Sequence, residues 1–378
     1  MASYDDQEIR RPALARSYLQ LLRAQPGRPI ALFAPRRVGK TYFLDQDLAP
    51  AARAEGLVPV YADVWLHRAS PLEAINHALE EALDDATVPP SRAGRSARTP
   101  VKKLGAFGAS VELGDEPRRR PLPAAPELRL DALVARLSTA AGKPLLLMVD
   151  EVQALGEHAQ GGAIVASLRA VLHKRKREVF AVFTGSSQEA LSAMMSAAGG
   201  PMYQFAQLLD FPVLGDDYLQ LLAAHFAHVH RGKRLALPDL RRAFERIGHK
   251  PALMKDLVKA MSAEGATDVD AALEHMLSDD HQIAGWRALL AGLQPIERAL
   301  LVLLAQAKPP MGRETLAELG AMSGSEPTIA KVRAALDRLQ RAGILAKPGG
   351  RWLIEDRLFA EHLAAPATTP KLSRRTAA

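Results

Sequence analysis

Two short groups of residues carry the chemistry that this sequence could perform. Residues 34–41 read Ala-Pro-Arg-Arg-Val-Gly-Lys-Thr, the spacing of a phosphate-binding P-loop with alanine in place of its first glycine. Residues 145–151 read Leu-Leu-Leu-Met-Val-Asp-Glu, an apolar run that ends in two carboxylates. The first group could hold phosphates, and the second could hold a divalent cation and a water molecule. Together they predict a site for a nucleoside triphosphate.

The residues of the loop suit phosphate binding. Gly39 lets the backbone turn so that successive N–H groups face the phosphates, and a helix expected to begin near Lys40 adds its positive end. The Lys40 ammonium would pair with the β- and γ-phosphates and assist catalysis, and the Thr41 hydroxyl could ligate Mg²⁺. We therefore expect ATP and Mg²⁺ as the ligands. The expected nucleotide contacts are Ala34, Pro35, Arg36, Arg37, Val38, Gly39, Lys40, Thr41 and Tyr42.

The two carboxylates at the end of the apolar run would complete this site. Asp150 would hold Mg²⁺ through a water molecule, and Glu151 would orient or deprotonate the water that attacks the γ-phosphate. Acidic residues also follow ordinary strands, where they begin solvated helices. The pair therefore indicates catalysis only because the P-loop accompanies it.

A third polar group follows the apolar run Val179–Phe183 and reads Thr-Gly-Ser-Ser. Its spacing makes Ser186 the best candidate for contacting the γ-phosphate or the attacking water. The alternative is that the group begins a helix, with Ser187 capping residues 188–193. Both interpretations can hold at once.

Alternating strands and helices would bring these groups together. We expect strands at Ile30–Phe33, Leu57–Val64, Pro144–Val149 and Val179–Thr184, and helices at Asp5–Ala24, Pro71–Leu83, Leu128–Leu137 and Ile164–Leu172. Buried apolar strands separated by helices are typical of parallel βαβ units. The sequence thus predicts an α/β fold, in which a parallel sheet has helices on both faces.

The chain is expected to divide into several parts. The sheet domain would span residues 1–212, interrupted at residues 89–126 by a stretch with seven prolines and an Arg-Arg-Arg run. Such a stretch buries too little apolar surface to order itself, so we expect an exposed, disordered excursion, with one small hairpin near residues 106–113. Helices alone follow in residues 213–285. A further domain would span 286–364, and a flexible tail 365–378.

The domain at 286–364 has the pattern of a winged helix-turn-helix. Three helices are expected at Pro295–Ala305, Arg313–Gly320 and Glu326–Ala342, followed by short strands at Ile344–Lys347 and Arg351–Ile354. In the third helix, one apolar stripe recurs at helical spacing, and basic residues lie opposite. The stripe is Ile329, Val332, Leu336 and Leu339; the basic residues are Lys331, Arg333, Arg338 and Arg341.

The charge of this domain does not decide whether it binds DNA or a protein. The formal net charge is +7, and residues 286–378 hold 14 Lys and Arg against 8 Asp and Glu. Residues 326–354 could therefore place a basic helix in the major groove of DNA. Against this, acidic residues offset the basic face and no aromatic residues interleave it. A docking or autoinhibitory module that binds a protein is the equal alternative.

The composition of the chain argues against a disulfide-bonded, secreted or membrane-spanning protein. The chain has no cysteine, which excludes disulfides and thiolate metal sites. We expect no secretory signal, since the first residues are polar and acidic, and no membrane span, since the most apolar run is far shorter than about 20 residues. A cytoplasmic location is the expectation.

In their order, the loop, the Asp-Glu pair followed by Gln153, and the Phe-Thr-Gly-Ser-Ser strand end resemble the archaeal-type ATPases, in the STAND branch of the AAA-like P-loop NTPases. The Gly-His-Lys-Pro turn at Gly248–Pro251 and the winged helix are similar too. The resemblance implies ATP at the carboxyl edge of the sheet, a helical lid at 213–285 and a switch mode of action.

The chain also departs from this resemblance. No arginine can be assigned as a finger that serves an adjacent subunit. The basic cluster His173–Arg177 could do so, although a solvated helix end is the favoured interpretation.

Three functions follow from these features. The first is a slow, regulated ATPase that acts as a switch on an unidentified protein partner, on another copy of the chain or on DNA. The second is a DNA-binding regulator gated by nucleotide, in which hydrolysis is incidental. The third is a scaffold that keeps the P-loop only for folding. Glu151 argues against the third, because a site without hydrolysis has no use for a second carboxylate.

Overall fold

The structure is a computed structural model that describes residues 4, 8–67, 69–87, 121–157, 161–186, 205–278, 280–324, 327–347 and 351–364. The chain divides into two compact units. One comprises Arg10–Ala34 and Lys40–Phe211 and holds the sheet. The other comprises Pro212–Ala378 with the short segments Met1–Ile9 and Pro35–Gly39. Each unit is described by itself.

The sheet has five parallel strands in the order β2-β3-β4-β1-β5. The strands are β1 (Ile30–Phe33), β2 (Val58–Asp63), β3 (Leu145–Asp150), β4 (Val179–Gly185) and β5 (Gln207–Asp210). Every residue of β3 is buried, as expected for a central strand covered on both faces. Four strands lie where the sequence predicts them, and β5, which has only four residues, was not predicted. The predicted α/β fold is confirmed.

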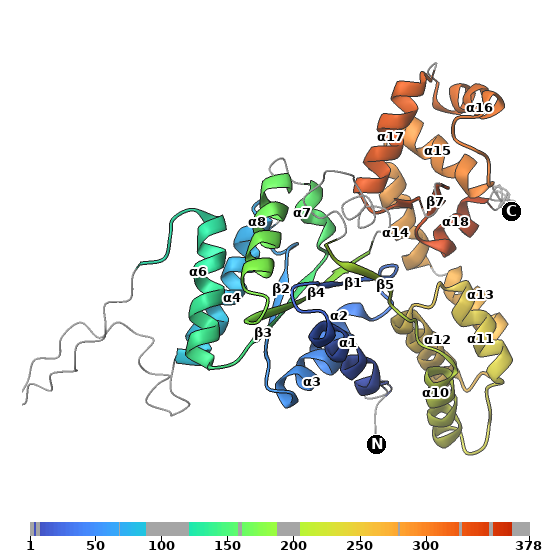
Figure 1. The fold of residues 1–378 in the computed structure, drawn as a ribbon. Coiled ribbons are helices and arrows are strands. Elements are labelled where there is room, and N and C mark those ends of the chain that lie inside the picture. The colour runs from blue at the N-terminus through green and yellow to red at the C-terminus, as the bar shows by residue number, and fades with distance from the viewer. Residues whose placement is uncertain are drawn as a thin grey trace, which may run out of the picture. The chain divides into compact units, whose positions relative to one another are not determined.

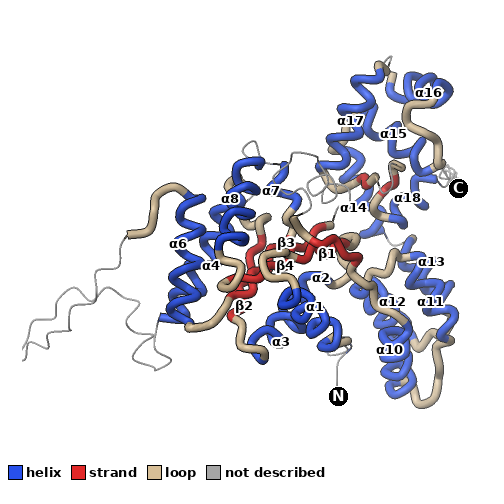
Figure 2. The backbone as a smooth tube through the Cα atoms, in the orientation of Figure 1, coloured by secondary structure: helices blue, strands red, loops and turns tan. Residues whose placement is uncertain are grey.

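Helices cover both faces of this sheet (Figures 1 and 2). On one face lie α4 (Pro71–Thr87), α6 (Pro126–Ala141) and α8 (Gly161–Lys174), and on the other α1 (Pro12–Ala24) and α3 (Ala49–Ala54). In α6, Leu130, Leu133, Val134 and Leu137 recur at helical spacing and are buried in the core of this unit.

The P-loop is followed by a continuous helical segment with an irregular middle. It begins as α2 (Lys40–Phe43), widens into a π-helical turn at Leu44–Leu48 and resumes as α3. Pro50 accounts for the widening, because proline has no N–H to donate and its ring excludes the carbonyl four residues back. Asp47 lies buried in this turn, and its Oδ1 accepts from Arg10 Nε at 3.0 Å and from Arg11 N at 2.9 Å. The turn thereby fixes the segment that enters α1.

The second unit begins with five helices. They are α10 (Asp216–Val229), α11 (Leu237–Arg246), α12 (Pro251–Glu264), α13 (Val269–Leu277) and α14 (Asp280–Ala291). The Gly-His-Lys-Pro turn stands directly before α12, and Gly248 and His249 both adopt positive φ there, +71° and +54°. The helical character expected from Asp216 onward is confirmed.

The remaining elements of this unit have the order of a winged helix-turn-helix. Helices α15 (Pro295–Ala305), α16 (Arg313–Ser323) and α17 (Ile329–Arg341) precede the antiparallel pair β6 (Leu345–Ala346) and β7 (Leu353–Ile354). A last helix, α18 (Arg357–Ala364), was not predicted. In α17, Val332, Leu336 and Leu339 are buried as expected, but Ile329 is 58% exposed. Ile329 is the first residue of the helix, where no preceding turn packs beside it.

Several expectations fall outside the described residues. These are most of the excursion (88–120) with its hairpin, the helix capped by Ser187, the turn at 348–350 and the tail. Pro126, which was predicted as the end of the excursion, is instead the first residue of α6, and its carbonyl accepts from Asn76 Nδ2 at 3.0 Å.

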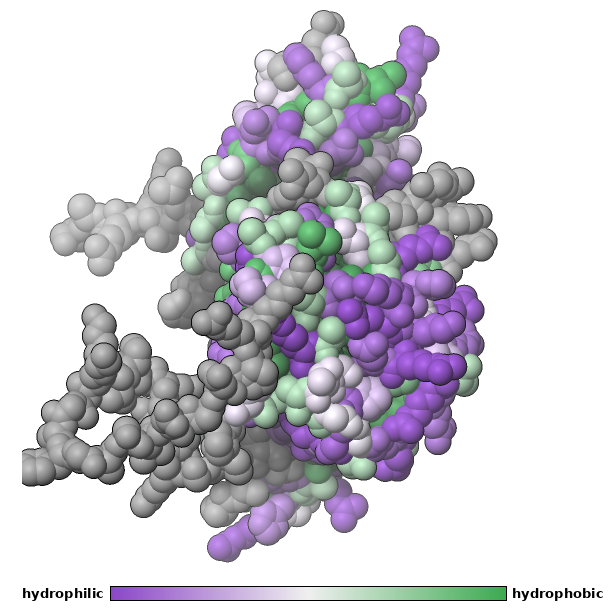
Figure 3. Space-filling model, turned by 60° about the vertical axis from the view of Figure 1, so that its left-hand side comes forward, coloured by the Kyte–Doolittle hydropathy of each residue, from purple (hydrophilic) through white to green (hydrophobic). Residues whose placement is uncertain are grey.

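The surface of the described residues is mixed in hydropathy. On the face drawn in Figure 3, hydrophilic residues predominate among the coloured ones, with smaller hydrophobic areas between them. Across the described part of the chain, no helix combines the length and apolar character needed to cross a bilayer.

Candidate functional site

Asp150 lies at the centre of a set of hydrogen-bond donors at the carboxyl ends of the strands. Its Oδ2 accepts from the Thr41 hydroxyl at 2.7 Å and from the Tyr61 hydroxyl at 3.1 Å. Its Oδ1 accepts from the backbone N–H of Glu151 at 3.0 Å and from the Thr184 hydroxyl in a short hydrogen bond. Asp150 and Thr184 are both buried. Four donors thus hold a buried carboxylate in one orientation, as charge-assisted hydrogen bonds do.

The sheet order explains this convergence. Strand β4 lies between β3, which ends in Asp150, and β1, which leads into the P-loop. Thr184 therefore reaches Asp150 from one side, and Tyr61 on β2 reaches it from the other. Burial and the neighbouring carboxylates raise the pKa of Tyr61, burial having the larger effect, so the phenol remains a donor at neutral pH.

The Thr41 and Asp150 pair fits a magnesium site. A hydroxyl and a carboxylate oxygen 2.7 Å apart are oxygen ligands of the kind that Mg²⁺ takes, together with water and substrate phosphates. Thr41 belongs to the first helical turn after the loop, and Asp150 to the buried end of β3. The donor set and its position both suit a cation that bridges protein and phosphate.

Two residues of the loop have left-handed backbone conformations. Gly39 has φ of +94° and Arg37 has φ of +66°, so the backbone alternates in hand there. A Cβ placed on Gly39 would meet no described atom within 4 Å, so φ and not crowding calls for glycine. Lys40 is buried, and its Nζ donates to the carbonyl of Ala34 at 2.5 Å. The ammonium is thereby directed to the carbonyl at the end of the segment that contains β1.

Glu151 stands next to Asp150 but belongs to a second network. It has φ of +55°, a left-handed conformation that is unfavourable for any residue with a Cβ. The Ser186 hydroxyl donates to Glu151 Oε2 at 2.7 Å, and Gln153 Nε2 donates to the same oxygen in a short hydrogen bond. The strained backbone and the two donors fix this carboxylate in the residue next to Asp150.

The sequence-predicted residues are thus partly brought together. Lys40, Thr41, Asp150, Glu151 and Ser186 all lie in the sheet unit, and Ser186 contacts Glu151. Three supporting residues were not assigned from the sequence. Thr184 and Gln153 lie inside the motifs but had no role, and Tyr61 had no signal other than a tyrosine in an apolar strand.

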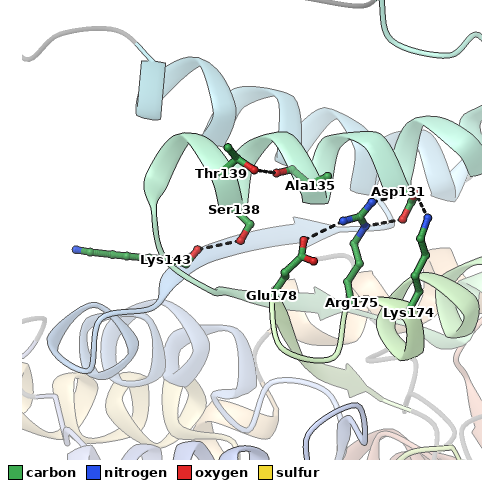
Figure 4. Close-up of polar contacts among 8 residues, drawn as sticks. All are labelled: Asp131, Ala135, Ser138, Thr139, Lys143, Lys174, Arg175 and Glu178. Atoms are coloured by element: carbon green, nitrogen blue, oxygen red, sulfur yellow. Dashed lines mark hydrogen bonds and ion pairs between the residues drawn. The ribbon is translucent and has the colours of Figure 1, made fainter.

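The basic cluster His173–Arg177 lies at the opposite edge of the sheet. Arg175 Nε donates to Asp131 Oδ1 at 2.5 Å, its Nη1 donates to Glu178 at 2.9 Å, and Lys174 Nζ reaches Asp131 at 2.8 Å (Figure 4). The hydrogen bond from Arg175 lowers the pKa of Asp131. Arg175 thus ties the turn after α8 to α6.

Comparisons with known proteins support the fold. No protein-family model matches the sequence, and no curated protein matches it. A Walker-type ATPase of Pyrococcus abyssi is 17% identical with a TM-score of 0.59, over 96% of this chain and 97% of that one. The ORC2 protein of Aeropyrum pernix, in ADPNP–ADP complexes, is 17% identical with a TM-score of 0.50, over 93% of this chain and 92% of that one. This chain has the P-loop NTPase fold.

Proposed function

We propose that the protein binds ATP with Mg²⁺ and hydrolyses it slowly, as a STAND-like switch that controls a protein or DNA partner through its winged helix. The observation that carries this proposal is the pairing of Thr41 with Asp150 at the end of β3, with Glu151 held beside it. The similar P. abyssi structure is described as a Walker-type ATPase, which is consistent with the proposal.

In the proposed site, the loop's N–H groups and Lys40 would bind the phosphates of ATP, and Thr41 and Asp150 would hold Mg²⁺. When bound, Mg²⁺ neutralises charge on the β- and γ-phosphates. Lys40 would then exchange the carbonyl of Ala34 for phosphate oxygens, which are stronger acceptors for an ammonium. Thr184 and Tyr61 keep Asp150 aimed at the cation.

Glu151 is the proposed general base. Only Oε2 of its carboxylate is used by Ser186 and Gln153, and Oε1 accepts no hydrogen bond from the residues that the structure describes. The second oxygen is therefore available to accept a proton from a water molecule that attacks the γ-phosphate. Ser186 holds the base through Oε2 and can contact the γ-phosphate only by releasing it, because its single proton serves one acceptor at a time.

The switch is supported by contacts within the second unit. Lys250, in the turn before α12, reaches Asp356 at 3.3 Å, and Arg246 of α11 bridges Glu274 at 2.5 Å and Glu361 of α18 at 2.9 Å. The pair with Glu274 lies within the proposed lid, whereas the pairs with Glu361 and Asp356 join the lid to α18 and to the residue just before it. A displacement of the lid would then be passed to the winged helix.

The decisive experiment compares the parent protein with Glu151→Gln. The variant should bind MgATP with unchanged affinity and hydrolyse it at least about 100-fold more slowly, because the amide cannot take the proton. Glu178→Gln is the matched control, since Glu178 lies at the other edge of the sheet beside Arg175. Equal turnover in the parent and Glu151→Gln would refute the assignment of the base.

A nucleotide-gated DNA-binding regulator is the alternative. Lys331, Arg333 and Arg341 are exposed on α17, which favours a phosphate-contacting surface. Arg338, expected on the same surface, is instead paired with the buried Glu297 at 2.7 Å. Replacing the three exposed residues by glutamine should weaken DNA binding and flatten its salt dependence. Affinity that does not change with salt would exclude this alternative.

A further inference from the structure

We infer that Gln153 is a positioning residue that holds Glu151 in place for catalysis, an inference that rests on the proposed ATPase function. Gln153 is the first residue of α7 (Gln153–Glu157) and is only 5% exposed. Its side chain therefore points into the site and not into solvent.

Gln153, Glu151 and Ser186 are joined to one another by three hydrogen bonds. Gln153 Nε2 donates to Glu151 Oε2 and also to Ser186 Oγ, the latter at 3.3 Å. The Ser186 hydroxyl uses its single proton to donate to Glu151 Oε2 at 2.7 Å. Glu151 Oε2 thus accepts from both the amide and the hydroxyl, and no two donors or two acceptors face each other.

The orientation of the amide follows from these contacts. If the amide were turned over, its carbonyl oxygen would face the Glu151 carboxylate, and two acceptors would repel each other. The observed orientation leaves Gln153 Oε1 enclosed without a hydrogen bond from the described residues, which is unfavourable. Gln153 therefore keeps its hydrogen bond to Glu151 although its own Oε1 then accepts no hydrogen bond from the described residues.

This contact has a consequence for the base. Glu151 has a left-handed backbone conformation and belongs to the two-residue turn between β3 and α7. Without the amide, its carboxylate would keep only the hydrogen bond from Ser186 and could rotate about it. With the amide in place, one carboxylate oxygen is fixed from two directions and the other is left for the attacking water.

The test is steady-state ATP hydrolysis by the parent, Gln153→Leu, Gln153→Asn, Glu151→Gln and the double variant Glu151→Gln with Gln153→Leu. Gln153→Leu should lower kcat by about 10- to 100-fold and leave KM and MgATP affinity unchanged, because only the base is misplaced. Gln153→Asn, which keeps the donor, should recover part of the rate. Gln20→Leu, on the exposed side of α1, is the matched control.

The double variant separates positioning from general damage. If Gln153 acts through Glu151, its replacement should have no further effect once Glu151 is already Gln. An additive loss of rate, a rise in kcat for Gln153→Leu, or an unchanged kcat would each overturn the inference while the parent remains an ATPase. A parent without ATP hydrolysis would overturn the proposed function, and this inference with it.

Discussion

The Thr41 hydroxyl donates to Asp150 Oδ2 at 2.7 Å, across 109 positions of the sequence. Thr41 is held by the helical turn that follows the P-loop, and Asp150 by the buried end of β3. Neither residue defines a cation site alone, because one hydroxyl or one carboxylate is common on any surface. Their contact is what the fold adds to the two motifs.

The first prediction concerns this contact. Thr41→Val removes the hydroxyl and keeps the shape, and should weaken binding of MgATP by about 10- to 100-fold, as loss of a metal-site contact does. Thr41→Ser should bind nearly as the parent does. Titration calorimetry with Mg²⁺ and with a chelator measures the difference.

The control for this prediction is Thr139→Val, because among the described residues the Thr139 hydroxyl bonds only the carbonyl of Ala135 in its own helix (Figure 4). It should bind MgATP as the parent does. Equal loss of affinity for Thr41→Val in the presence and absence of Mg²⁺ would show that Thr41 acts on the nucleotide without the cation.

The second prediction concerns the opposite edge of the sheet. Asp131 has a lowered pKa because Arg175 donates to it, so its contribution to stability is present above the unfolded pKa and is lost as pH falls through the folded pKa. Asp131→Asn should lower the free energy of unfolding by about 1 kcal/mol at pH 7. Below about pH 4 the difference between parent and variant should shrink.

Urea unfolding at several pH values checks this prediction. ATP turnover should not change at neutral pH, because Asp131 lies away from Asp150. If the stability difference were the same at pH 7 and pH 3, the ion pair with Arg175 would not be its cause.

The third prediction concerns the ion pair between Lys250 and Asp356. The Lys250 side chain is 11% exposed, so Asp356→Asn leaves a nearly buried ammonium without its charged partner. This variant should lose about 1–3 kcal/mol of stability. Lys250→Met should lose less, because an apolar side chain tolerates burial.

Asparagine is chosen because Asp356 Oδ1 also accepts from the N–H of Leu358 at 3.1 Å at the start of α18, and asparagine can keep this cap. Asp337→Asn, an exposed residue of α17, is the control. A larger loss for Lys250→Met than for Asp356→Asn would contradict the explanation.

From the sequence we could predict the parts of the candidate site that are made of residues adjacent in the chain. The loop, Asp150 and Glu151 are recognisable because adjacent residues must have particular types. Thr184 and Tyr61 could not be assigned, because each reaches Asp150 from a flanking strand and strand order is not written in any one segment. Likewise, Ile329 fits the apolar periodicity of α17 yet is exposed, because periodicity does not say where a helix begins.

The end of strand β4 contacts both of the adjacent carboxylates, Asp150 and Glu151. Thr184 lies in β4 and Ser186 directly follows the last residue of that strand, so their Cα atoms are separated by at most about 7 Å. The first contacts Asp150 and the second contacts Glu151. The end of β4 therefore positions both Asp150 and Glu151. With the roles proposed above for Asp150 and Glu151, a partner that displaced the end of this strand would misplace both residues together and would stop hydrolysis without contacting the nucleotide.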